Sequence, residues 1–176
     1  MPILSDRGYT GGLLESEMFG RIIEKEEDAG QREYIPYRGA MDIVKKSQPD
    51  EDLSCPKARF ANDLYQGLYH DLELENKKDL RFYTAVGSCL DYKHGVDAFF
   101  EMDFEGKIIT VTLDITSSKN KSDGYKADVI IEIPGEGLDP DLEEDKEAYK
   151  FKVEESVNNI TKIIDYKISE ILRREK

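Results

Sequence analysis

The chain has 176 residues with 39% hydrophobic and 36% charged side chains, and its formal net charge is −13. This length and composition predict a single, highly charged globular domain with a substantial core. No apolar run approaches the roughly 18 residues that a membrane-spanning helix requires, and the first residues lack the pattern of a signal peptide. These features predict a cytoplasmic protein without a membrane partner, and the acidity disfavours tight nonspecific DNA binding.

The first half of the chain predicts two helices and a strand. A helix is expected over about residues 13–29, ending at Gly30, a residue that readily adopts left-handed backbone conformation. Residues 31–54, with two prolines, predict a loose and only partly helical connection. Apolar residues then recur at three- and four-residue spacing over about 57–75, which predicts a second helix, and residues 80–86 predict a strand.

Residues 95–116 predict a β-hairpin with a turn at Glu105-Gly106, so that residues whose numbers sum to 211 lie opposite each other. One face of this hairpin is apolar throughout. It contains Val96, Ala98, Phe100, Met102, Ile109, Val111, Leu113 and Ile115. The alternation predicts that this face is buried, whereas the opposite face, which carries Asp97 and Asp114, is a polar surface or a cleft.

Asp97 and Asp114 are placed directly across from each other by this register. Like charges at opposed positions of a sheet are unfavourable, so a cation between them is expected. A divalent metal ion is one candidate, since carboxylates are its preferred ligands and such pairs occur in phosphodiester-cleaving sites. Two alternatives remain: solvated aspartates on an exposed face, or a structural ion-paired cluster in which Lys119 balances the charge.

The last third of the chain alternates in charge. Residues 119–126 are locally basic, residues 128–133 predict a strand, and residues 132–147 carry eight acidic side chains against one lysine. That acidic block either faces a basic protein partner or keeps the chain in solution. Residues 142–174 predict one long helix or two joined helices, whose apolar stripe fits packing along a sheet or, alternatively, a homodimer contact.

The run Gly95-Val96-Asp97, followed by a hairpin and then Asp114-Ile115-Thr116 with lysines nearby, resembles the PD-(D/E)XK nuclease superfamily. The resemblance implies an α/β fold: a mixed β-sheet flanked by helices, with a restriction-endonuclease-like αβββαβ core. It further implies one domain over residues 1–176. Its parts would be an N-terminal helical extension (1–54), the nuclease-like core (55–135) and a long C-terminal helix (136–176).

The resemblance also implies roles for individual residues. Asp97 and Asp114 match the two motif acids, which hold Mg²⁺ or Mn²⁺ and take part in catalysis. The position of the motif lysine is occupied by Thr116, so Lys119 is the first substitute for the catalytic lysine and Lys121 the second.

An upstream acidic residue on a helix completes the metal site in many members, and three candidates fit that position. Asp71 is the metal ligand we expect, with Asp63 and Glu24 as alternatives. The implied function is metal-dependent hydrolysis of DNA or RNA. The alternative is a catalytically inactive nuclease-fold module that acts in protein binding or assembly, which the missing motif lysine and the net charge favour.

Overall fold

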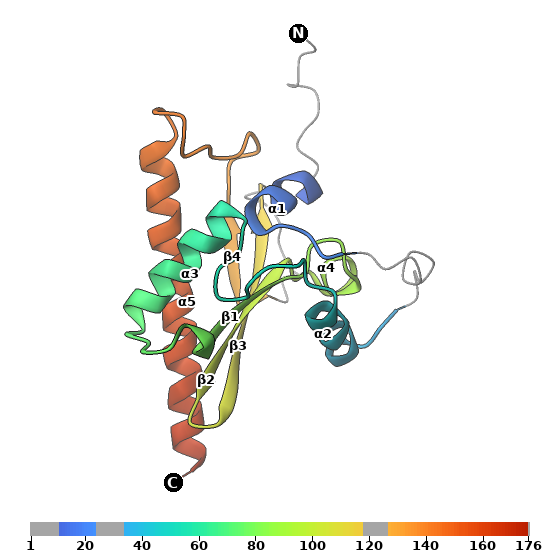
Figure 1. Ribbon diagram of the computed structural model, residues 1–176, viewed down its shortest axis with the longest axis vertical. Coiled ribbons are helices and arrows are strands. Elements are labelled where there is room, and N and C mark those ends of the chain that lie inside the picture. Colours follow the sequence, from blue (N-terminus) through green and yellow to red (C-terminus); the bar gives the residue numbers. More distant parts are fainter. Residues whose placement is uncertain (1–10, 24–33, 118–126, 176) are drawn as a thin grey trace.

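The computed structural model describes residues 11–23, 34–117 and 127–175. In chain order its elements are α1 (Gly11–Phe19), α2 (Tyr37–Lys46), α3 (Arg59–Asp71), the short 3₁₀-helix η2 (Lys77–Asp79), β1 (Leu80–Thr84), α4 (Cys89–His94), β2 (Ala98–Phe104), β3 (Lys107–Thr116), β4 (Val129–Glu132) and α5 (Lys146–Arg174). The sheet has the order β1-β2-β3-β4, with β3 and β4 parallel and the other pairs antiparallel. The expected mixed α/β fold with an N-terminal and a long C-terminal helix is therefore confirmed (Figure 1).

The β2–β3 hairpin has the register that the sequence predicts. Ala98 lies opposite Leu113 and Phe104 opposite Lys107, so paired residue numbers sum to 211. Glu105 and Gly106 both have positive φ, 48° and 76°. A two-residue turn with this conformation matches the right-handed twist of the flanking strands.

The apolar face of the hairpin packs against α1, α3 and α5, and this layer forms the main core. Its fully buried side chains include Phe19, Phe60, Leu64, Tyr65, Leu68, Phe100 and Leu113. The two helices α3 and α5 approach closely at Gly67, where an added Cβ would lie 2.6 Å from Val157 Cγ2. Glycine is therefore required at this helix crossing by space rather than by backbone conformation.

The opposite face of the sheet is more buried than predicted. We expected a polar surface or cleft, but α2 and α4 cover its Asp97 end with a second, smaller core (Figure 1). The side chains of this core are Ala40, Met41, Val44, Tyr83, Ala85, Leu90, Val96 and Phe99. Towards the hairpin turn the same face opens, and Ile108 is 58% exposed. The prediction is wrong at the Asp97 end because residues 31–54 contain a full amphipathic helix, α2. Val96 was predicted on the apolar face of the hairpin, and that prediction is wrong because the paired register ends at Ala98.

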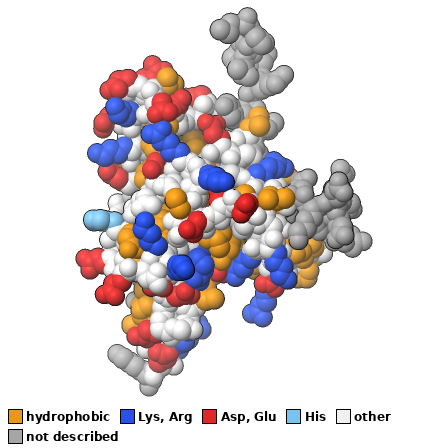
Figure 2. Space-filling view, viewed as in Figure 1, with side chains coloured by type: hydrophobic (Ala, Val, Ile, Leu, Met, Phe, Trp, Pro, Cys, Tyr) orange, Lys and Arg blue, Asp and Glu red, His pale blue; other side chains and the backbone are white. Residues whose placement is uncertain are grey.

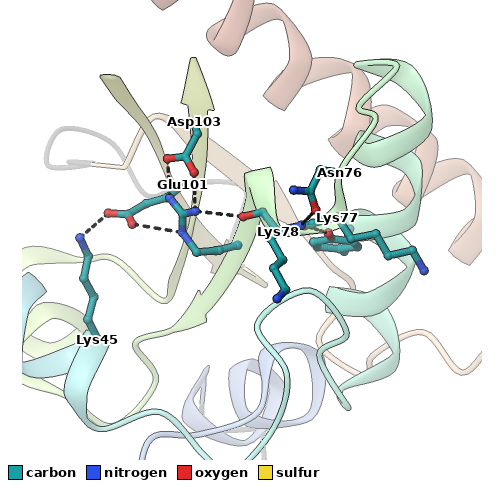
Figure 3. A network of polar contacts seen from close by, with 8 residues as sticks. Lys45, Asn76, Lys77, Lys78, Glu101 and Asp103 are labelled. Carbon is teal, nitrogen blue, oxygen red and sulfur yellow. Dashed lines mark hydrogen bonds and ion pairs between the residues drawn. The ribbon is translucent and has the colours of Figure 1, made fainter. Parts of the chain in front are cut away.

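A network of charged residues joins α2 to this face (Figure 3). Glu101, buried to 3% exposure, forms ion pairs with Lys45 of α2 and with Arg81 of β1. Arg81 also donates two hydrogen bonds to Asp103, of 2.8 and 2.9 Å, and this contact raises its pKa. Burial of a carboxylate is tolerated here because two cations compensate it.

The expected helix over residues 13–29 is shorter than predicted. It ends at Phe19, because Gly20 adopts the left-handed conformation with φ of 74°. The chain then runs beside the end of β1: Thr84 Oγ1 donates to the Gly20 carbonyl, and Ile22 N donates to the Val86 carbonyl. The rest of the predicted helix, including Gly30, lies outside the described residues.

The predicted strand over 80–86 ends at Thr84, and the predicted strand over 128–133 is observed as β4. Residues 146–174 form one continuous helix rather than two. Within the described ranges, no helix is both long and apolar enough to cross a membrane. Residues 118–126, where an αβββαβ order would place its second helix, are not described.

Candidate metal centre

Asp97 is fixed in place by the backbones of two neighbouring strands. Its amide N–H donates to the Leu113 carbonyl (2.8 Å), and its carbonyl accepts from Ala85 N (2.7 Å). Its carboxylate Oδ2 accepts a hydrogen bond from Ile115 N (2.7 Å). The side chain is only 1% exposed, so Asp97 is a rigid carboxyl group at the end of the sheet.

Three further acidic side chains come to Asp97 from different elements. Glu15 belongs to α1, Asp91 to α4 and Asp114 to β3. One carboxylate oxygen from each of Glu15, Asp91 and Asp97 lies within 4.8 Å of the other two. Asp114, 6% exposed, is close enough to Asp97 to raise its pKa through charge repulsion, although the paired register of β2 and β3 ends at Ala98 and Leu113. We call these four residues the acidic cluster.

Local structure at the start of α4 orients Asp91. Ser88 is the N-cap residue, and its hydroxyl accepts from Asp91 N. The Asp91 carboxylate in turn accepts from Gly87 N at 2.9 Å. Gly87 has φ of 88°, a conformation that favours glycine. This pairing resembles a capping box and directs the Asp91 side chain back along the chain towards the end of β1.

Burial dominates the electrostatics of Asp97. Loss of solvent raises the pKa of its carboxyl group most, and the charges of Glu15, Asp114 and Asp91 raise it further. The hydrogen bond from Ile115 N opposes these effects, yet the pKa still rises from 3.8 to about 9. Without a compensating cation, Asp97 therefore keeps its proton at neutral pH.

The donor set of the acidic cluster fits a hard divalent cation. Carboxylate oxygens are the ligands that Mg²⁺, Mn²⁺ and Ca²⁺ prefer. Ligand oxygens on opposite sides of Mg²⁺ are about 4.2 Å apart, and those around Ca²⁺ about 5 Å. The 4.8 Å limit on the separations among Glu15, Asp91 and Asp97 is close to both values, so these three carboxylates are near enough to share one such ion.

The sequence predicts two of these four residues. Asp97 and Asp114 lie together as expected, and Thr116 is buried at the end of β3. Asp71 is exposed at the end of α3, with its carboxylate 3.7 Å from His70 Nδ1. From Asp71 the chain continues to Leu80, the first residue of β1, which pairs with Met102. Asp97 lies at the other end of the β1–β2 pair, next to Ala98, which pairs with Thr84. Asp71 therefore leads to the end of this strand pair that is away from Asp97.

Of the other residues named from the resemblance, only Asp63 lies in the described part of the chain. Asp63 accepts a hydrogen bond from the Tyr149 hydroxyl (2.7 Å), which ties α3 to α5. Glu24, Lys119 and Lys121 lie outside the described residues. His94, three residues before Asp97, has its Nε2 2.8 Å from the Ile35 carbonyl oxygen and so belongs to the contact between α4 and the start of α2.

Glu15 and Asp91 are the two members that sequence reasoning missed. Asp91 had a local signal, because Ser88-x-x-Asp91 before a short apolar stretch and Gly95 after it are typical of a capped helix. Glu15 had no such signal. It lies 76 to 99 residues before the other acids, and only the packing of α1 against the sheet brings it near them.

Comparisons with known proteins identify no relative for this chain. No family model, curated protein or solved structure matches it.

Proposed function

We propose that the protein is a metal-dependent nuclease-like enzyme that hydrolyses phosphodiester bonds of DNA or RNA at the acidic cluster. The observation that carries the proposal is the position of Asp97. It is a carboxyl group 1% exposed, with Glu15 and Asp91 oxygens within 4.8 Å and with Asp114 near enough to raise its pKa. Carboxylate oxygens of three side chains within 4.8 Å of one another form the donor set that a hard divalent cation prefers.

In this proposal Asp97 and Asp114 hold Mg²⁺ or Mn²⁺, as the motif resemblance implies, and Glu15 takes the place of the upstream acid expected at Asp71. Such an ion would supply Lewis-acid polarisation of the phosphate and a bound water of lowered pKa. The hydrogen bond from Ile115 N keeps the Asp97 carboxylate in one orientation, and the bond from Gly87 N does the same for Asp91. Lys119, or else Lys121, would assist the attacking water.

Calorimetric titration with Mn²⁺ at pH 8 tests the metal site. We expect saturable heat for the wild-type protein and strongly weakened binding for Asp97→Asn, because the neutral amide lacks the charge of the carboxylate. Asp71→Asn is the matched control: it removes an exposed carboxylate elsewhere on the protein and should leave the titration unchanged. Equal heats for wild type and Asp97→Asn would refute the site.

Cleavage is tested separately with labelled single-stranded DNA, duplex DNA and RNA in the presence of Mn²⁺. We expect products with the wild-type protein and none with Asp114→Asn. Cleavage that persists unchanged in Asp114→Asn would arise from a contaminant or from another site, and would contradict the proposal.

The second candidate function is a silent module of the same fold that binds a protein partner. One observation favours it: threonine, rather than lysine, occupies position 116 at the end of β3. A protein that binds Mn²⁺ through Asp97 but cleaves none of the three nucleic acids would support this alternative over catalysis. The acidic residues of 132–147 would then be the first surface to test for a basic partner.

A further inference from the structure

The layer formed by α2 and α4 lies beside the acidic cluster and differs from the whole chain in charge. Four basic residues (Arg38, Lys45, Lys46 and Lys93) and two aspartates (Asp42 and Asp91) belong to these helices, in a chain of net charge −13. Lys45 is paired with Glu101, whereas Arg38, Lys46 and Lys93 are exposed. Figure 2 shows Lys and Arg side chains gathered over α2.

The same layer carries most of the exposed aromatic rings in the described part of the chain. Among the exposed large apolar side chains there are four tyrosines: Tyr34, Tyr37, Tyr92 and Tyr166. Tyr34 precedes α2, Tyr37 begins α2 and Tyr92 belongs to α4, whereas Tyr166 and one further exposed ring, Phe151, lie on α5. The rings of Tyr34 and Tyr37 pack 5.6 and 5.5 Å from the buried ring of His94, so they are held in place while one side remains open.

Tyr92 and Arg21 connect this layer to the acidic cluster. Arg21 Nη2 lies 3.4 Å from the Tyr92 hydroxyl, to which it donates. The guanidinium also lies against Gly87, where an added Cβ would be 2.9 Å from Nε. Because Gly87 N donates to the Asp91 carboxylate, Tyr92 and Arg21 stand at the rim of the cluster. A polymer that crosses α2 and α4 would reach the four acids at this point.

We infer that the α2–α4 surface, made of Arg21, Tyr34, Tyr37, Arg38, Lys46, Tyr92 and Lys93, binds single-stranded nucleic acid and brings one of its phosphates to the acidic cluster. The inference rests on the proposed function only for what the bound strand is used for, because the binding itself requires no metal. Exposed tyrosine rings stack on bases, and only an unpaired strand presents its base faces. Lysine and arginine side chains neutralise the phosphates that follow each base.

Fluorescence anisotropy with the full chain, in EDTA and at low salt, tests the inference. The probes are a fluorescein-labelled oligothymidylate, its oligouridylate counterpart and a DNA duplex of the same length. We expect the single strands to bind more tightly than the duplex. Tyr92→Ala should weaken single-strand affinity roughly 5- to 100-fold, the usual effect of losing one base stack. Tyr92→Phe should retain it, because the ring remains.

Tyr166→Ala is the matched control, since it removes a comparably exposed ring from α5 and should leave the affinity unchanged. Arg38→Ala and Lys93→Ala should each reduce the slope of log affinity against log salt by about 0.7, the value per phosphate contact on single strands. Wild-type affinity in Tyr92→Ala, equal affinity for duplex, or no binding at low salt would each overturn the inference.

The two proposals fail in different ways. Single-strand binding in EDTA that depends on Tyr92, without any Mn²⁺ heat, would leave this inference standing and remove only the proposed function. Mn²⁺ binding and cleavage that are insensitive to Tyr92→Ala at every substrate concentration would support the proposed function and overturn this inference.

Discussion

Replacing Asp97 with asparagine should make the metal-free protein more stable near neutral pH. In the folded state burial and the neighbouring acids raise the pKa of Asp97 from 3.8 to about 9, so this carboxyl keeps its proton while the unfolded chain releases it. A carboxyl group whose pKa is higher in the folded protein than in the unfolded chain stabilises the fold fully at pH values below the unfolded pKa. That contribution is lost as the pH rises to and through the folded pKa. The loss therefore runs from about pH 4 to about pH 9.

The size of the effect follows from that window. Each pH unit costs about 1.4 kcal/mol when one proton is retained only by the folded state. From pH 4 to pH 7 the loss is therefore about 4 kcal/mol, a large share of the stability of an ordinary domain. Asparagine has the shape of the protonated carboxyl and cannot titrate. The free energy of unfolding of Asp97→Asn, relative to that of the wild type, should thus increase by about 1.4 kcal/mol per pH unit over this range.

Urea unfolding of both proteins in EDTA at pH 5, 6, 7 and 8 measures the difference. Only the difference between the two proteins is informative, because Glu15, Asp91 and Asp114 face Asp97 in both. Asp71→Asn serves as the control and should follow the wild type at each pH. A stability difference between Asp97→Asn and wild type that is the same at pH 5 and pH 8 would refute the reasoning.

Three further predictions concern packing, charge and backbone conformation. Gly67→Ala should destabilise the protein by about 1–2 kcal/mol despite the better helix propensity of alanine, because its Cβ would lie 2.6 Å from Val157 Cγ2. Urea unfolding measures this loss, and adding Val157→Ala to the same chain should recover most of it. Glu101→Gln should cost about 3 kcal/mol by leaving Lys45 near a buried site without its anion; a loss below the error of denaturant titration would show that water already screens the pair. Gly20→Ala should lower the thermal midpoint through roughly 1 kcal/mol of strain at φ of 74°, and an unchanged midpoint would contradict the assigned helix stop.

Local patterns in the sequence were enough to predict the sheet and much of its register. The alternation over residues 98–113 and the Glu105-Gly106 turn predicted which residues pair, since a slip of one residue would turn every apolar side chain to the other face. The predicted proximity of Asp97 and Asp114 came from that register, although the observed pairing ends one residue earlier, at Ala98 and Leu113. The helices α3 and α5 followed from their apolar periodicity.

Only the tertiary structure decided what surrounds the aspartates. Glu15 reaches Asp97 because α1 stops at Gly20 and packs against the sheet, and no spacing in the sequence encodes that contact. Asp91 reaches it because α4 is inserted between β1 and β2. The cover of α2 and α4 turned an expected polar face into a buried one and so raised the pKa of Asp97. Burial and charge repulsion act through space, and both depend on residues far apart in the chain.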